Sequence, residues 1–310
     1  IIQGDLDFPV AGFFAKIGDL GKVENVVFED VYVEGRFSYA GCVAGVNYGL
    51  IGMCEIKNAE IINNYQNGFT GGICGLNERK AGSDNFAQVN ICTSNAKITS
   101  KWVAGGAVGY NYGGVIFNCL VKTDSLYLSV VEGADSTYSY FGGLAGISNC
   151  GVEGENYYDS YVSNSIAYIA NVAVTSSHIA GIFGSYYGIS GAYASEGNYN
   201  MLFYVADSTL KPYYLFDDDQ ILSDKNPNTA QNYAKQISHE EACKQKTYTS
   251  IPNNKWDFDN VWEIEEGVAI RLGYVRINGE EMEYQAFSSN GGVVDISTDE
   301  QLIEAFETIR

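Results

Sequence analysis

YAGCVAGVNYGLIGMCEI, at residues 39–56, returns as a close variant, VAGGAVGYNYGGVIFNCLV, at residues 103–121. Both stretches contain a pair of small residues, a glycine three positions later, an Asn-Tyr-Gly turn and an apolar run with a cysteine. Aligned on the second residue of the pair, the chain holds six copies, spaced by 30, 30, 34, 37 and 38 residues: Gly12, Cys42, Gly72, Gly106, Gly143 and Gly181. Self-similarity at a nearly fixed period is typical of repeat architectures.

Two further columns of residues accompany this repeat. Three positions after the aligned residue lie small side chains: Ala15, Gly45, Gly75, Gly109, Gly146 and Gly184. Two positions further on lie polar ones: Asn47, Asn77, Asn111 and Ser148. Glycine permits the sharp turns and close strand contacts that a stack of repeats requires. Asparagine suits a turn, and stacked asparagine side chains can form hydrogen bonds from one repeat to the next.

The apolar run after each turn alternates with period 2, which predicts a strand with one buried face. In two repeats the inward set is read as Leu50, Gly52, Cys54, Ile56 and as Val115, Phe117, Cys119, Val121. The repeat around Cys92 fits less well, because its inward set includes Asn90 and Ser94. Cys54, Cys92 and Cys119 share one slot, and we expect them to stack inside the fold as small apolar residues. Adjacent repeats bring their Cα atoms near disulfide range, so an oxidised pair stays open as an alternative.

A unit of about 30 residues can hold three short strands and three turns, which makes one coil of a parallel β-helix. Stacking at roughly 4.8 Å per coil would give a rod on the order of 30 Å long. We therefore predict an all-β fold, a right-handed parallel β-helix (solenoid) of about six or more coils. A small helical and loop insertion is expected near its C-terminal end. A β-propeller is the main alternative, but its blades usually need about 40 residues or more.

Composition agrees with repetitive β structure and excludes some classes of partner. The 310 residues include 35 Gly, 24 Tyr and 4 Pro. The net charge of −20, from 18 basic and 38 acidic side chains, argues against nucleic acid and against anionic membrane surfaces. No apolar run reaches the roughly 20 residues that span a bilayer, so we expect no direct membrane insertion. The chain begins with Ile1 and shows no signal peptide, which predicts a mature or excised fragment.

Three phrases carry a resemblance to a known repeat family: TGGICGLN at residues 70–77, AGGAVGYNYGGVIFNC at 104–119 and FGGLAGIS at 141–148. They resemble the GLUG repeat of bacterial surface and secreted proteins. WDFDNVWEIEEGVAIRL, at residues 256–272, is similar to the segment that commonly closes such arrays. The resemblance covers residues 8–205 and 256–272, although Cys42 and Ala180 replace glycine and the fifth and sixth repeats lack the cysteine. It implies an adhesin-like module, extracellular or on a bacterial cell surface, and supplies no catalytic residue set.

Four segments are predicted along the chain. Residues 1–205 form the GLUG-like repeats. Residues 206–255 hold an acidic loop and a helix from Ser238 to about Lys246, whose capping box pairs Ser238 with Glu241 and which could cap the open end of the stack. Residues 256–287 form closing strands and a hairpin at Asn278-Gly279. Residues 288–310 read as the start of a following module.

Candidate chemical sites are sparse. The two histidines, His178 and His239, are far apart in sequence and read as an ordinary repeat residue and a solvent-facing helix residue. The run Asp217-Asp218-Asp219 is a weak Ca²⁺ alternative, because calcium loops usually space their ligands with a glycine. A solvated loop is preferred there. We expect no metal and no cofactor.

Tyrosine is more suggestive of binding. Doublets stand at Tyr157-Tyr158, Tyr186-Tyr187 and Tyr213-Tyr214. Tyrosine offers a flat apolar face with a polar edge, which suits sugar stacking or protein contact. Simple coverage of the repeat surface is the alternative reading of these six residues.

Two classes of function follow. The first is a non-enzymatic scaffold or adhesin-like module that displays tyrosine-rich loops to a host glycan or surface protein and continues into further domains of the same polypeptide. The second is a polysaccharide-active enzyme, a lyase or glycoside hydrolase, which rests on analogy with other β-helices alone. The scarcity of histidine and of basic residues favours the first.

Overall fold

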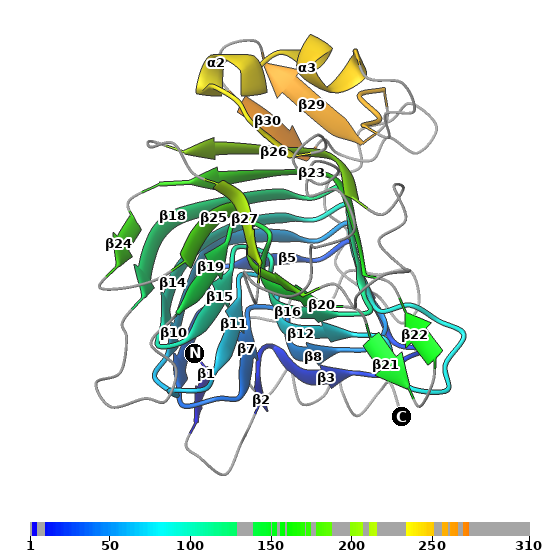
Figure 1. Ribbon diagram of the computed structural model, residues 1–310, viewed down its shortest axis with the longest axis vertical. Coiled ribbons are helices and arrows are strands. Elements are labelled where there is room, and N and C mark those ends of the chain that lie inside the picture. The colour runs from blue at the N-terminus through cyan, green and yellow to red at the C-terminus, as the bar shows by residue number, and fades with distance from the viewer. Residues whose placement is uncertain are drawn as a thin grey trace, which may run out of the picture.

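The fold is mostly β-strand, with two large parallel sheets that curl around a shared core (Figure 1). The computed structural model describes residues 2–4, 10–128, 139–149, 151–153, 156–158, 160–170, 172–174, 178–187, 199–206, 211–215, 234–250, 256–259, 261–265 and 269–272. The prediction of an all-β fold built from parallel strands is thereby confirmed. None of the described helices has the length and apolarity that crossing a membrane requires.

One sheet contains the strands before and after the glycine pair. The strands before the pair, position 1, are β2 (Val10–Ala11), β7 (Tyr39–Gly41), β11 (Phe69–Gly71), β15 (Val103–Gly105) and β19 (Tyr140–Gly142). The strands after it, position 2, are β3 (Phe14–Ile17), β8 (Ala44–Asn47), β12 (Cys74–Glu78), β16 (Val108–Tyr112) and β20 (Ala145–Asn149). Strand β25 (His178–Tyr187) spans both positions and pairs with β27 (Lys211–Leu215).

The other sheet contains the remaining two positions. Position 3 holds β4 (Lys22–Glu24), β9 (Leu50–Gly52), β13 (Gln88–Asn90) and β17 (Val115–Phe117). Position 4 holds β1 (Ile2–Gly4), β5 (Val27–Glu29), β6 (Tyr32–Gly35), β10 (Glu55–Asn63), β14 (Thr93–Ser100), β18 (Leu120–Leu128), β24 (Val172–Val174) and β28 (Ala234–Gln236). Strands β23 (Tyr161–Ile169) and β26 (Tyr199–Ala206) each run from position 3 into position 4.

Equivalent residues of successive repeats lie side by side in these sheets. Gly41, Gly71, Gly105 and Gly142 pair in sequence, although 30 to 37 residues separate neighbours along the chain. The space around this column forbids side chains: a Cβ atom on Gly105 would overlap the carbonyl oxygen of Val108 and lie 2.5 Å from the nitrogen of Gly146. The glycines therefore let positions 1 and 2 approach backbone to backbone.

The asparagine column is continuous inside the turn after position 2. Asn47 donates from Nδ2 to Oδ1 of Asn77 at 2.9 Å, and Asn77 donates to Oδ1 of Asn111 at 2.8 Å. Asn111 then lies 3.4 Å from the hydroxyl of Ser148. All four side chains are fully buried. Each amide satisfies its neighbour, which removes the cost of burying an unpaired polar group.

A left-handed corner separates positions 3 and 4. Its residues have φ between 48° and 59°: Asn25, Met53, Ile91, Asn118 and Asn164. The corner shifts the phase of the alternating pattern, so Ile51 and Ile116 point into the core while Leu50 and Val115 are half-buried. The predicted inward sets were therefore wrong before the corner, at Leu50, Val115 and Phe117, and are confirmed after it, where Cys54, Ile56, Cys119 and Val121 are buried. The repeat around Cys92 obeys the same geometry, with Val89, Cys92 and Ser94 inward.

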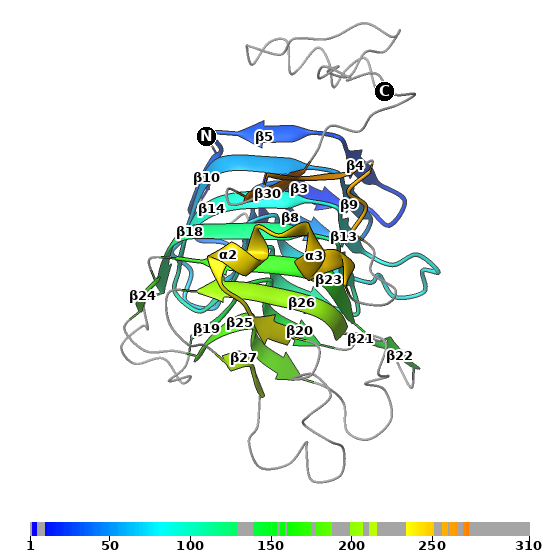
Figure 2. The same ribbon diagram turned by 90° about the horizontal axis from the view of Figure 1, so that it is seen from above.

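A second, smaller core lies on the outer face of the position 4 strands. Its base is a column of three apolar residues in neighbouring strands, Leu120, Ile166 and Phe203. Ile237, Ala242, Tyr248, Trp256 and Trp262 complete this flank cluster. Figure 2 shows α2 (His239–Ala242) and α3 (Gln245–Thr249) over β18, β23 and β26. The helices cover a side of the stack, where the sequence had predicted a cap on its end.

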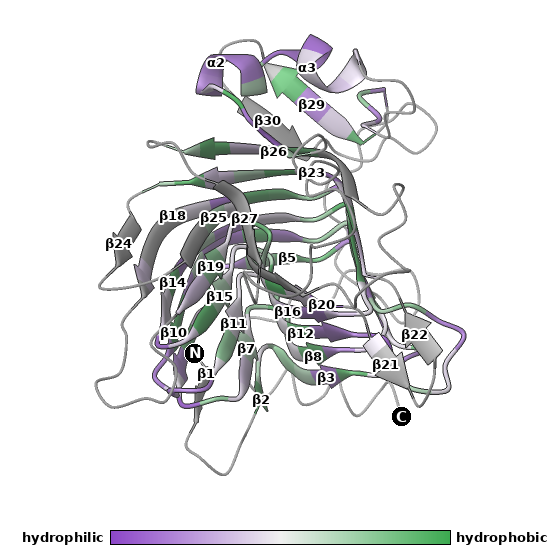
Figure 3. Cartoon of the chain, viewed as in Figure 1, coloured by the Kyte–Doolittle hydropathy of each residue, from purple (hydrophilic) through white to green (hydrophobic). Residues whose placement is uncertain are grey.

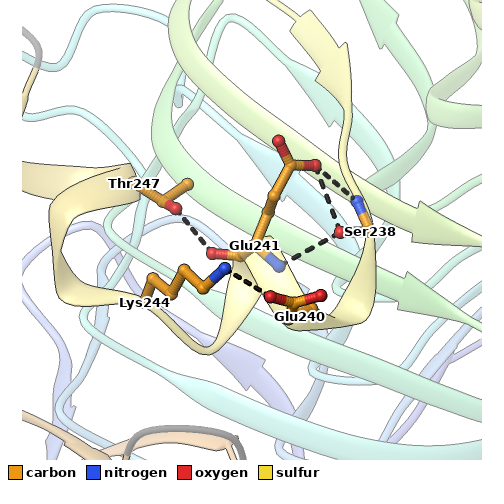
Figure 4. Close-up of polar contacts among 5 residues, drawn as sticks. All are labelled: Ser238, Glu240, Glu241, Lys244 and Thr247. Carbon is orange, nitrogen blue, oxygen red and sulfur yellow. Dashed lines mark hydrogen bonds and ion pairs between the residues drawn. The ribbon is translucent and has the colours of Figure 1, made fainter.

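The predicted helix at residues 238–246 is interrupted. The capping box is present: Glu241 N donates to Ser238 Oγ at 3.1 Å, and Ser238 N donates to Glu241 Oε2 at 3.0 Å (Figure 4). The helix then ends at Cys243, and a second one begins after Lys244. This break turns Tyr248 inward, where its hydroxyl donates to the carbonyl of Ala242 at 2.6 Å.

Two antiparallel hairpins complete the described structure. Strands β21 (Gly151–Glu153) and β22 (Asn156–Tyr158) follow position 2 of the fifth repeat. Strands β29 (Trp262–Glu265) and β30 (Ala269–Leu272) belong to the flank region beside α2 and α3, and Figure 3 shows that these two helices are largely hydrophilic. The predicted hairpin at Asn278-Gly279 and residues 288–310 lie outside the described residues.

Candidate functional site

Five aromatic side chains gather on the sheet of positions 1 and 2, and we call them the aromatic row: Tyr39, Phe69, Trp102, Tyr110 and Tyr112. The rings of Tyr39 and Phe69 are 5.5 Å apart and 19° from parallel. Those of Phe69 and Tyr110 are 5.1 Å apart and 18° from parallel. Because successive repeats place these residues side by side, the row continues from the second repeat to the fourth.

Polar groups border the aromatic row. Asn149 donates from Nδ2 to the hydroxyl of Tyr110 at 3.1 Å, and burial raises the pKa of Tyr110 to about 12. Burial also raises the pKa of Glu78, against the opposing effect of Lys16. Two buried atoms here have no hydrogen-bond partner, Nε1 of Trp102 and Oδ1 of Asn149. The border thus carries one carboxyl group, one ammonium group and several neutral hydrogen-bonding groups.

The ring orientation limits what this row can do. Near-parallel planes mean that Tyr39, Phe69 and Tyr110 turn their faces toward one another, so the faces serve stacking between repeats. Ring edges and phenol groups remain for contact with another molecule. A nucleophile paired with a base is absent from the residues that form the row.

The six tyrosines predicted from sequence lie on strands and not on loops. Tyr157 and Tyr158 belong to β22, Tyr186 and Tyr187 to β25, and Tyr213 and Tyr214 to β27. Their side chains lie outside the described residues. The backbone register puts Tyr187 beside Asn149, and Asn149 beside Tyr112 of the aromatic row. Sequence reasoning missed the row itself, because Tyr39, Phe69 and Tyr110 come from two strand positions that only the fold brings together.

The cysteine slot is an interior column. Cys54, Cys92 and Cys119 are fully buried, each at the residue after the left-handed corner. The Sγ atom of Cys54 is 3.3 Å from the carbonyl of Gly52, and Cys119 repeats this contact with Phe117 at 3.3 Å. Hydrogen bonding to the Cys92 thiol, together with burial, raises the pKa of Cys54. Burial raises the pKa of Cys92 as well, so the thiols of Cys54 and Cys92 resist ionisation and are poor nucleophiles.

The remaining candidates offer little chemistry. Among the cysteines that the structure describes, all six are free thiols. His239 is exposed on α2, and its Nε2 atom lies 3.7 Å from Sγ of the buried Cys243. Burial raises the pKa of the Cys243 thiol. His178 lies in β25, with its side chain outside the described residues. Asp217, Asp218 and Asp219 also lie outside them, and the described part of the chain contains no cluster of three or more metal-ligating side chains.

Comparison with known proteins leaves the chain without an assigned relative. No protein-family model, no curated protein and no solved structure matches it. Any functional conclusion must therefore come from the repeat geometry and the surface that it displays.

Proposed function

We propose that the chain is a non-enzymatic repeat scaffold, an adhesin-like module of a bacterial cell-surface or secreted protein that resembles the GLUG type. Its repeats would form a right-handed parallel β-helix that presents aromatic residues to a host glycan or surface protein. The observation that carries the proposal is the register. Residues equivalent in the repeat pair with one another from Val10 to Tyr187, and buried asparagines connect four repeats by hydrogen bonds.

The register supports a scaffold because the residues that recur in the repeats form the contacts between neighbouring repeats. Glycine, asparagine and cysteine columns are all interior, which leaves the outward positions free to vary between repeats. Two of the tyrosine-bearing strands, β25 and β27, pair with each other at the C-terminal part of this sheet, and β25 also pairs with β20. A rigid sheet that carries amphipathic rings is suited to binding.

Binding to arrays of host glycans and host surface proteins tests the proposal. We expect a ligand whose affinity falls about tenfold when Tyr157→Ser and Tyr158→Ser are combined. Tyr127→Ser is the matched control, because Tyr127 is an exposed tyrosine on β18, in the other sheet. A protein that binds nothing on either array would be a spacer. Reproducible cleavage of a glycan, abolished by one carboxylate substitution, would favour the enzyme.

A further inference from the structure

The two ends of the stack differ from its middle in having strands with one neighbour. At the N-terminal end, β2, β3, β4 and β5 pair only with the next repeat among the described strands. At the other end, again among the described strands, β27 pairs only with β25 and β28 pairs only with β26. Figure 2 shows the two sets at opposite ends. A strand with an unpaired edge is a template for adding another strand.

The N-terminal end also exposes an interior column. Phe13 donates its N–H to the carbonyl of Cys42, which places it at the head of a column whose later members are fully buried: Val43, Ile73, Ala107, Leu144 and Ile182. Phe13 itself is 46% exposed and packs edge-on against Phe28 at 5.6 Å. The end therefore offers apolar surface together with strand edges.

Each end also carries a partial repeat, and the two partial repeats occupy different positions. At the N-terminus, β1 lies beside the second half of position 4, where Ile2 pairs with Val33. At the C-terminal end, β28 lies beside the first half of position 4, where Lys235 pairs with Phe203. Strand β27 lies beside positions 1 and 2. Stacked end to end, the two partial repeats would not compete for the same place.

We propose that the N-terminal end is a docking surface for the C-terminal end of a second copy of this chain. Every pairing in the two large sheets is parallel among the described strands, so only a head-to-tail copy continues them in the same direction. Such a contact uses two different surfaces and does not close on itself, so it builds linear chains of molecules. The inference uses the stacked geometry of the proposed scaffold and requires no glycan or protein ligand.

One column of paired residues identifies two side chains that would meet. It runs from strand to strand through seven residues: Val27, Glu55, Thr93, Leu120, Ile166, Phe203 and Lys235. In a head-to-tail assembly the next member after Lys235 is Val27 of the second copy. Val27 is half-buried and Lys235 exposed in the single chain, so both accept substitution.

Sedimentation velocity and electron microscopy over a range of concentrations test this docking. The wild-type mass should grow beyond that of a dimer as concentration rises, with linear chains visible. Val27→Lys should weaken association about fivefold, because it opposes Lys235, and Val27→Glu should strengthen it by a similar factor. Lys235→Glu should rescue Val27→Lys, and melting curves of all variants control for stability.

Two results would overturn the docking. One is a monomer at every concentration. The other is association that ignores the charges at both positions. A monomer that still binds a glycan overturns the docking alone, whereas an assembling protein without any ligand overturns the ligand part of the proposed function alone.

Discussion

The interior of the stack and the flank cluster are both apolar cores, yet they are built from different side chains. The interior holds mainly alanine, valine, isoleucine and cysteine around glycine columns, with a few larger rings such as Phe141 and Tyr204. The flank cluster packs Trp256 against Trp262 at 4.8 Å and Tyr248 against Trp256 at 4.9 Å. Repetition explains the difference. The glycine columns draw two backbones together and leave little room for large side chains between them, whereas helices lying on the outer face of a sheet leave room for rings.

The sharpest way to break the interior is to add a side chain where two backbones meet. Gly105→Val should destabilise the protein by more than about 4 kcal/mol, because the new Cβ atom overlaps the carbonyl oxygen of Val108. Urea unfolding followed by circular dichroism measures the loss. Gly52→Ala is the control: its Cβ would lie 3.5 Å from the nearest atom, an ordinary contact, so the change should stay within about 1 kcal/mol. Equal losses for both variants would contradict the close contact.

The flank cluster should come apart without the interior. Trp262→Ala removes a side chain that is 1% exposed and should cost about 3–5 kcal/mol. We expect hydrogen exchange to accelerate in residues 234–272 while the asparagine column keeps its protection. Leu20→Ala, at a residue 81% exposed, should change nothing measurable. Uniform loss of protection along the whole chain would show that the two cores unfold as one unit.

Within the interior, the asparagine column should contribute less than the glycines. Asn77→Ala removes one of the acceptors of the Asn47 amide and leaves Oδ1 of Asn111 without the donor from Asn77, which should cost about 2–3 kcal/mol. Chemical denaturation compares this variant with Asn85→Ala, an exposed asparagine in the loop before β13. A loss at Asn77 no larger than that at Asn85 would mean that water replaces the missing amide.

How far the sequence predicts the structure depends on whether a feature repeats. The glycine and asparagine columns could be read from spacing, because glycine recurs in five of the six copies and asparagine in three, and each has one physical role. The corner between positions 3 and 4 could not, because Met53 and Ile91 adopt a left-handed conformation that their residue types rarely take. The flank cluster gave no signal either. Its column reads Val27, Glu55 and Thr93 in the first three repeats and is apolar in successive strands only from Leu120 to Phe203.

The candidate binding residues also differ in whether the sequence predicts them. The tyrosine doublets were visible as sequence, and the structure pairs two of their strands, β25 and β27, without describing the side chains. The aromatic row was not visible, because Phe69 and Tyr110 are 41 residues apart and belong to different strand positions. Only the offset between position 1 of one repeat and position 2 of the next brings their rings together. The binding role of either set stays a prediction.

The smallest expected effect compares the same corner inside and outside the flank cluster. Three repeats place asparagine there, and asparagine tolerates the left-handed region that Met53 and Ile91 occupy at φ of 50° and 52°. Met53→Asn should therefore stabilise the protein by about 0.5–1 kcal/mol. Ile91 packs against the flank cluster, so Ile91→Asn should lose about 1 kcal/mol of apolar contact, which offsets the relief of strain. Thermal melting of both variants measures the difference. Equal shifts in melting temperature for the two variants would mean that the contact of Ile91 with the flank cluster does not stabilise the protein. The two cores would then be independent even where they are in contact.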